Sequence, residues 1–394
     1  MSIEENSDCT CSLLLAAMKG DLKLVEHFIN SGTNVNISDK YGMTPLYHAA
    51  ENGHLEVVIL LLEKGADNKF ACDAYKWTPL HKAIQNGHTQ TAIYIMKYMK
   101  YNFDMKVRDH NRDTPLHTAL FMENIDIIKF MLNNFDCDVT SHNHHAHTPL
   151  DIACMKDLPL PIVKLLLEKG ANPNSLLDET NPGWTSLFHA CKSCNQSLLT
   201  LLIKHGGILD YKDSYDNTLY HIACLYGNLD IVKLLFEHIP ENINLESHLG
   251  IIPLHFACLK GKKRIVEYLA EQQEQSPKLT DINGDNSLCF ACEGGHLPIV
   301  KWILCSGKID RLPDHRKNYP DYDSGCLTTV ENFLDNKVSF GCLRISFLRA
   351  CSKRCAQGGY TISNKFEDRL VSICSTNWYI KSSIYLYLGL HNFI

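Results

Sequence analysis

Four histidines stand within six positions of the sequence, in the stretch SHNHHAHTPL at residues 141–150. They are His142, His144, His145 and His147. Neutral imidazole nitrogens bind zinc, copper and nickel well, so such a cluster raises the question of a metal site. In an extended or turning loop neighbouring side chains diverge, and at most two or three of these rings could share one ion. Three alternatives stay open: a metal site, a polar contact surface whose charge changes near pH 6.5, and a solvated hairpin without a special role.

Two pairs of cysteines also have suggestive spacings. Cys191 and Cys194 form a CxxC pair, which binds zinc or carries out redox chemistry in other proteins. Cys351 and Cys355 form only a CxxxC pair. A second CxxC at matching distance is missing, and the sequence contains no P-loop, nucleophile elbow, HExxH or strand followed by GxGxxG. We therefore expect neither a metal, a cofactor nor catalytic activity.

A repeat positions these residues. Thr148-Pro149-Leu150 recurs, whole or degraded, at successive distances of 33, 34, 36, 34, 37, 33, 34 and 34 residues. The nine copies begin at Cys11, Thr44, Thr78, Thr114, Thr148, Thr185, Thr218, Ile252 and Asn286. Five residues after each start comes alanine, and nine residues after it comes glycine in six copies. An apolar set at i, i+1, i+4 and i+5 follows, as in Val57, Val58, Leu61 and Leu62, and these positions share one face of a helix.

The pattern predicts two short antiparallel helices in each repeat. Threonine can cap the first helix, and proline fits its first position, where an amide proton is not needed. About 33 residues cannot close a core alone, so stacking of neighbouring repeats must bury the apolar faces. Five fingers carry an aspartate five positions before the Thr position, and we interpret these residues as turn-forming: Asp39, Asp73, Asp109, Asp213 and Asp281.

The repeat resembles the ankyrin repeat, whose signature is T-P-L-H-x-A at a period of 33. Thr78-Pro79-Leu80-His81-Lys82-Ala83 matches it in full, as do residues 114–119. The resemblance covers roughly residues 8–310 and implies an all-α solenoid with projecting β-hairpin fingers and a concave surface for protein partners. Asp151, Phe188 and Cys289 replace the consensus histidine in three copies, which puts its hydrogen bonding in doubt there.

The register assigns most histidines and cysteines a structural role. His81, His117, His221 and His255 occupy the consensus site in the first helix, and His54, His88 and His296 follow the inter-helix glycine. Five cysteines directly follow the consensus alanine in consecutive repeats: Cys154, Cys191, Cys224, Cys258 and Cys292. We expect a column of buried thiols there, because packed helices lie too far apart for a ladder of disulfides. The histidine cluster falls on the finger before the first helix of the fifth repeat.

Fingers and first helices are free to vary, so we expect partner contacts there. The candidate partner-binding residues are Tyr41, Met43, Tyr75, Trp77, Arg112, His145, His147, Trp184 and Tyr215. Aromatic residues are enriched among interface hot spots, and arginine can clamp a carboxylate. The alternative is that some of these rings pack against the neighbouring finger.

Composition limits the class of partner. With 38 basic and 44 acidic residues the net charge is −6, so we expect no nucleic-acid partner. No apolar run approaches the length of a membrane span, and the first residues are unlike a signal peptide, so we expect no membrane insertion and a cytoplasmic location, with the nucleus left open.

The periodic pattern ends after Gly307. Residues 311–325 are interpreted as a linker, and residues 326–394 as a segment of unknown fold, either a degenerate cap or a small domain. The predicted function is a non-enzymatic scaffold or adaptor that binds a protein partner. The alternative is a targeting module for a small effector or a ubiquitin-ligase-adaptor-like C-terminal segment.

Overall fold

In the computed structural model, the described residues are 13–67, 76–98, 105–175, 183–272 and 279–306, and all lie in one compact unit of the chain. The predicted linker 311–325 and segment 326–394 lie outside the described residues. Their predicted boundaries and roles therefore stay predictions.

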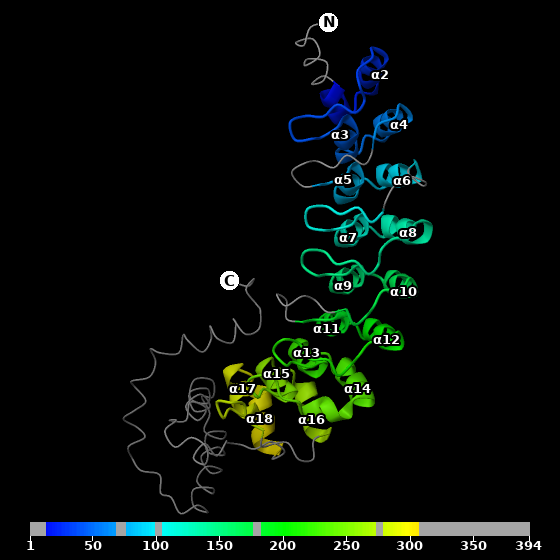
Figure 1. Cartoon of the computed structure of the whole chain (residues 1–394). Coiled ribbons are helices and arrows are strands. Elements are labelled where there is room, and N and C mark those ends of the chain that lie inside the picture. Colours follow the sequence, from blue (N-terminus) through cyan, green and yellow to red (C-terminus); the bar gives the residue numbers. More distant parts are fainter. Residues whose placement is uncertain (1–12, 68–75, 99–104, 176–182, 273–278, 307–394) are drawn as a thin grey trace, which may run out of the picture. The chain divides into compact units, whose positions relative to one another are not determined.

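Each repeat contributes a short first helix and a second helix that follows it (Figure 1). The first helices are α3 (Pro45–Glu51), α5 (Pro79–Gln85), α7 (Pro115–Phe121), α9 (Pro149–Met155), α11 (Ser186–Lys192), α13 (Leu219–Tyr226), α15 (Pro253–Leu259) and α17 (Ser287–Glu293). The second helices are α2 (Leu22–Asn30), α4 (Leu55–Glu63), α6 (Thr89–Tyr98), α8 (Ile125–Asn134), α10 (Leu160–Glu168), α12 (Gln196–Lys204), α14 (Leu229–His238), α16 (Lys263–Gln272) and α18 (Leu297–Ser306). Residues 13–19 are also helical, and a short 3-10 helix, η1 (Pro240–Asn244), follows α14.

The repeats stack in chain order. Each first helix packs on the first helix of the next repeat, and each second helix on the next second helix, so that two columns of helices run side by side (Figure 1). The fingers project from the column of first helices. Helices and turns, without a β-strand, make up the described residues, which confirms the predicted all-α solenoid.

The predicted helix starts are confirmed at the level of single hydrogen bonds. Thr44, Thr78, Thr114 and Thr148 are N-cap residues with extended backbone angles, and a proline occupies the first turn after each. The Thr44 hydroxyl accepts a hydrogen bond from the Tyr47 amide at 3.2 Å. Such a cap accepts a hydrogen bond from a first-turn amide that has no acceptor within the helix, and it contributes about 1 kcal/mol to the stability of the helix.

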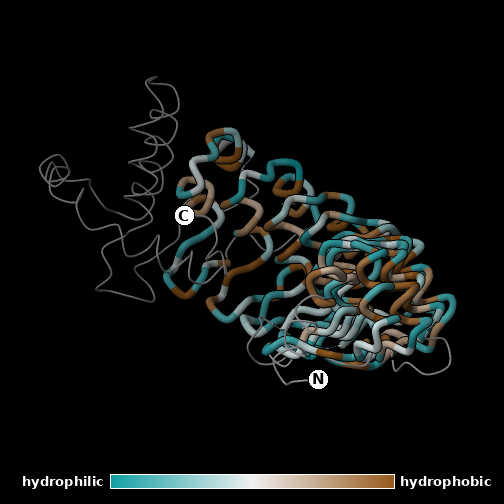
Figure 2. The backbone as a smooth tube through the Cα atoms, turned by 90° about the horizontal axis from the view of Figure 1, so that it is seen from above, coloured by the Kyte–Doolittle hydropathy of each residue, from teal (hydrophilic) through white to brown (hydrophobic). Residues whose placement is uncertain are grey.

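The apolar periodicity forms a continuous core. Val57, Val58, Leu61 and Leu62 of α4 are at most 1% exposed, and all nine consensus alanines are buried. Hydrophobic segments recur along the whole stack in Figure 2 rather than gathering at one place. Each such side chain contributes roughly 1.5–3 kcal/mol on burial, so stacking supplies the main stabilising free energy.

The fingers keep a hairpin shape without β-strands. The Asp39 amide donates to the Met43 carbonyl at 3.0 Å, and the Asp213 amide donates to the Asn217 carbonyl at 2.9 Å. The Asp39 carboxylate accepts from the amides of Tyr41 (2.8 Å) and Met43 (2.9 Å). Asp109, Asp213 and Asp281 accept from their own fingers in the same way, which confirms these aspartates as turn-forming residues.

Candidate functional site

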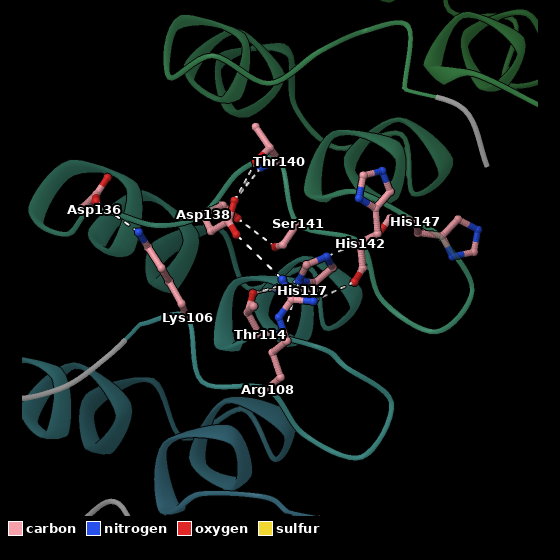
Figure 3. Close-up of polar contacts among 10 residues, drawn as sticks. All are labelled: Lys106, Arg108, Thr114, His117, Asp136, Asp138, Thr140, Ser141, His142 and His147. Atoms are coloured by element: carbon pink, nitrogen blue, oxygen red, sulfur yellow. Dashed lines mark hydrogen bonds and ion pairs between the residues drawn. The ribbon is translucent and has the colours of Figure 1, made fainter. Parts of the chain in front are cut away.

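Three of the consensus histidines, His117, His221 and His255, each connect a first helix to the next finger. The Thr114 amide donates to Nδ1 of His117 at 3.2 Å, so this nitrogen carries no proton and Nε2 does. His117 Nε2 then donates to the carbonyl of His147 in the following finger at 3.3 Å (Figure 3). His221 makes the same contact with Ile251 at 2.9 Å, and His255 with Leu279 at 3.2 Å.

Burial holds these rings neutral. It lowers the pKa of His117 and His221 to about 4 and that of His255 to about 3. The prediction of a structural role for the consensus histidines is confirmed.

Asp151 forms a different connection in the fifth repeat. Its Oδ2 accepts from the Thr148 amide (3.1 Å) and hydroxyl (2.7 Å), and its Oδ1 accepts from the Ser186 hydroxyl of the next repeat at 2.7 Å. Ser186 stands where five other copies have proline. The aspartate therefore keeps the cap, and the serine supplies the donor that a carboxylate needs in a site with 0% exposure.

The histidines after the inter-helix glycine form a second set of connections. Nε2 of His54, His88 and His296 donates to the carbonyl of Met18, Glu51 and Leu259 respectively, at 3.1, 3.0 and 2.9 Å. Each ring lies over the glycine of the preceding repeat. A Cβ added at Gly53, for example, would lie 2.4 Å from Nδ1 of His88. These three histidines are structural too, as predicted.

The histidine finger is held by its asparagine rather than by its histidines. Asn143 Oδ1 accepts from the amides of His145 and His147 at 3.0 Å each. Arg108 donates to the His142 carbonyl at 3.3 Å (Figure 3). The His145 and His147 rings are 6.0 Å apart, whereas the His144 ring lies against His110 of the preceding finger at 6.4 Å. Within the described ranges no three His, Cys, Asp or Glu side chains are placed to hold a metal ion.

The cysteine column consists of buried free thiols. Cys154, Cys191, Cys224 and Cys258 are 0% exposed and Cys292 is 4% exposed, and none of them is bridged. Burial raises the pKa of all five thiols, which keeps them in the unreactive protonated form. In the CxxC pair, Cys194 is free as well and occupies the inter-helix glycine position with φ 59°.

Two of the candidate partner-binding residues are tied to the next repeat. The Trp77 indole donates to the Asp109 carboxylate at 2.8 Å, and the Trp184 indole donates to Asp213 at 3.2 Å. Trp184 also stacks on Phe188, with ring centroids 5.9 Å apart. Both tryptophans are half-buried, so they connect neighbouring fingers and leave only part of their surface for a partner.

The remaining candidates vary in exposure. Tyr41 is 50% exposed, and Arg112 and His145 are exposed as well. Met43, His147 and Tyr215 are half-buried, and Tyr75 lies outside the described residues. These residues come from six different fingers and are not brought together into one site.

A pocket that the sequence did not indicate lies beside the finger that precedes α7 of the fourth repeat, which we call the fourth finger. It has a volume of about 240 Å³ and is lined by residues of three consecutive repeats: Trp77, His81, Gln85, Asp109, Asn111, Asp113, Thr118, Phe121, Met122 and Lys156. Of the lining residues, Met122 is 45% exposed. Met155, the last residue of α9, is 37% exposed. We call the surface formed by the fingers and the exposed side of the first helices the inner face.

One signal in the sequence could have identified this part of the inner face. Some copies place two polar residues at the end of the first helix, such as Glu51 and Asn52 or Gln85 and Asn86, whereas the fourth copy places Phe121 and Met122 there. Apolar residues at positions that the core does not use indicate a contact surface.

Comparison with known proteins identifies ankyrin repeats in the chain. A family model described as "Ankyrin repeats (3 copies)" matches residues 13–109, 94–177, 162–247 and 239–312, which together make up more than half of the chain. Relatives include the "Ankyrin repeat, SAM and basic leucine zipper domain-containing protein 1" of Carollia perspicillata and of Mus musculus, each 44% identical over 55 residues. These matches cover 14% of this chain and 12% of the relative.

The same protein of Otolemur garnettii is 37% identical over 70 residues, which is 18% of this chain and 14% of the relative. The similarity thus spans only a small part of the length of these relatives. Among the described helices none is long and apolar enough to cross a lipid bilayer.

Proposed function

Because the chain belongs to the ankyrin-repeat family, whose repeats are protein–protein interaction modules, we propose that it is a non-enzymatic scaffold or adaptor that binds a partner protein through its inner face. The observation that carries the proposal is how the repeat positions are used. Residues that recur from copy to copy cap helices and connect repeats, whereas residues that differ between copies are exposed on the inner face. Methionines such as Met122 and Met155 suit a contact surface because their side chains are flexible and polarisable.

Within this face, the exposed candidates Tyr41, Arg112 and His145 are the residues that we propose for direct contact. Arg112 has φ 59° at a finger position where four other copies have glycine, and Lys76, Ala146 and Asp216 share its left-handed conformation, so the arginine side chain rather than the backbone distinguishes this finger. The half-buried candidates Met43, Trp77, His147, Trp184 and Tyr215 contribute edges and hold the fingers in register. Tyr75 stays a candidate on sequence grounds alone.

Proximity labelling and affinity capture in the native cell test the proposal, with the full chain as bait. The test variant carries Tyr41→Ala, Arg112→Ala and Met122→Ala. The matched control carries Lys129→Ala, Lys164→Ala and Glu168→Ala, which change exposed residues of the second helices. We expect the test variant to lose its partner at an unchanged melting temperature and the control to keep it. The opposite pattern would show that binding uses the second helices and would refute the proposal.

The alternative, an array that targets a C-terminal effector or ubiquitin-ligase-adaptor-like segment, stays a prediction, because residues 326–394 lie outside the described residues. The absence of catalytic activity and the cytoplasmic location are likewise proposals from the sequence.

A further inference from the structure

The pocket beside the fourth finger has the dimensions of a side-chain site. Its volume of about 240 Å³ is below the roughly 300–1,000 Å³ of small-molecule sites. Apolar surface comes from Trp77 of the third repeat and from Phe121 and Met122 of the fourth. Such walls can hold the stem and the flat face of a partner's side chain.

The pocket has an excess of negative charge. Lys82 at its edge pairs with Glu51 at 3.3 Å and lies over the Trp77 ring at 4.2 Å, and Lys156 pairs with Glu123 at 3.1 Å. His81 stays neutral near pH 7, because burial lowers its pKa to about 4. Each cation thus has its own carboxylate, and the charges of Asp109 and Asp113 remain without a cationic partner among the described residues.

Hydrogen-bond acceptors in the pocket are also unused. Asp109 is occupied by the Trp77 indole and by the Asp113 amide, and Asp113 Oδ1 accepts from Asn143 at 2.9 Å. Asp113 Oδ2 has no hydrogen bond to any described residue. Gln85 Oε1 is buried and has no partner within the same ranges. A buried acceptor without a donor is unfavourable, so a ligand that donates to both groups would be stabilised.

We propose that this pocket binds an arginine side chain of the partner protein. A guanidinium carries five donors in a plane and can donate to Asp113 and Gln85 while its face packs on aromatic rings. This inference deepens the proposed function and rests on it, because it states which chemistry the inner face recognises in the third to fifth repeats.

Burial raises the pKa of the Asp113 carboxyl to about 6, with the nearby Asp109 adding to the effect and the Asn143 hydrogen bond and the His144 and His145 rings opposing it. A bound cation would lower this pKa again. Arginine binding should therefore weaken below about pH 6, where the Asp113 carboxyl is protonated.

Fluorine NMR of the full chain labelled with 5-fluorotryptophan provides the test. The Trp77 resonance is assigned with Trp77→Phe, and the probe is the blocked peptide acetyl-Gly-Arg-Gly-amide. The same peptide with citrulline, which has the shape of arginine without its charge, and the same peptide with lysine are the ligand controls. We expect the arginine peptide to shift the Trp77 resonance saturably, and the other two to bind at least about tenfold more weakly.

Asp113→Asn should weaken arginine binding by at least about tenfold, because the charge is lost while the acceptor for Asn143 is kept. Asp285→Asn is the matched control, since Asp285 stands at the same repeat position outside the pocket and should leave binding unchanged. Gln85→Leu provides a second test, with several-fold weaker binding expected, if Asp113→Asn lowers the melting temperature more than the control does.

Three results would overturn the proposal: no shift with arginine, equal shifts with citrulline or lysine, or unchanged binding by both pocket variants. If the peptide fails while the Tyr41, Arg112 and Met122 variant still loses the partner, the pocket is wrong and the inner face stands. If arginine binds but that variant keeps its partner, the proposed function fails and the pocket remains.

Discussion

At the scale of single residues, backbone conformation follows the position in the repeat rather than the residue type. Where glycine is missing between the two helices, Glu123, Asp157 and Cys194 still adopt the left-handed conformation, with φ of 55°, 50° and 59°. A side chain in that conformation costs about 1–2 kcal/mol relative to the ordinary helical region. The stacked neighbours hold these three residues in place against that cost.

Glu123→Gly should therefore stabilise the array by about 1 kcal/mol, since the strain is relieved and only an exposed ion pair with Lys156 is lost. Glu123→Ala is the control, because it loses the same ion pair but keeps the strained backbone. Hydrogen exchange of the α7 and α8 amides measures the effect locally. Equal protection in the two variants would show that φ at this position is not the cause.

Arg112 also has a left-handed backbone, at the finger position where Lys76, Ala146 and Asp216 have one as well, so this conformation belongs to the finger turn. Its side chain is exposed on the inner face, which is why Arg112 belongs in the binding experiment. Glu123 stands between the two helices of its repeat, so it belongs in the stability experiment.

At the scale of elements, neighbouring repeats are matched in pairs. A histidine after the inter-helix turn always follows a repeat that has glycine there, as with Gly20 and His54 or Gly261 and His296. The repeats that have Glu123, Asp157 and Cys194 in place of glycine are followed by Leu158, Asn195 and Asn228. The ring and a Cβ cannot occupy the same space, which explains the pairing.

Gly53→Ala should destabilise the array more than Gly87→Ala. Both glycines have φ 75°, so both variants incur a backbone strain of about 1 kcal/mol. At Gly53 the new Cβ would also displace the His88 ring and break its hydrogen bond to Glu51, for about 1–3 kcal/mol more, whereas nothing lies within 4 Å at Gly87.

Chemical denaturation of the two variants measures the difference. Adding His88→Ala to each variant provides the control, because the difference between the two glycine positions should then largely disappear. A difference that persists without the histidine would refute the steric explanation.

The elements were predictable from sequence to a greater extent than the site. Threonine caps, first-turn prolines and finger aspartates act over two to four residues, so their spacing alone predicts the contact. The sequence could not decide whether Trp77 contacts a partner or the neighbouring finger. Its hydrogen-bond acceptor, Asp109, belongs to the next repeat, and no short spacing connects the two residues. The pocket depends on the side chains of Gln85, Asp113 and Met122 from two repeats, and no short spacing encodes their convergence.

At the scale of the whole molecule, the buried histidines link stability to pH. The folded-state pKa of His221 is lowered to about 4, below the value of about 6.5 in an unfolded chain. The unfolded state thus binds more protons between these values, so the contribution of His221 is complete above pH 6.5 and is lost as the pH falls toward 4. Asp113 and Asp285, with pKa values raised to about 6 and about 7, act in the opposite direction.

His221→Asn separates these effects. At pH 7.5 we expect it to lower the stability of α13 and α15 by about 2 kcal/mol, because the hydrogen bond to Ile251 is lost. At pH 5 the difference in stability between the wild-type chain and the variant should be smaller by about 2 kcal/mol, since the wild-type chain has by then lost the contribution of the neutral His221 ring. Hydrogen exchange of these helices at both pH values is the measurement, and a gap independent of pH would contradict the assignment.

The matched pairs also limit how such a chain can change its number of repeats. A repeat with glycine in its inter-helix turn can be followed by a repeat with histidine after that turn, so copies of that kind are interchangeable. Asp151 needs the Ser186 hydroxyl, and Cys194 needs a neighbour without a ring at Asn228, so the central repeats fit only the order in which they stand. Loss or duplication of a single central repeat would bring mismatched surfaces together, whereas the middle block could be moved as a unit.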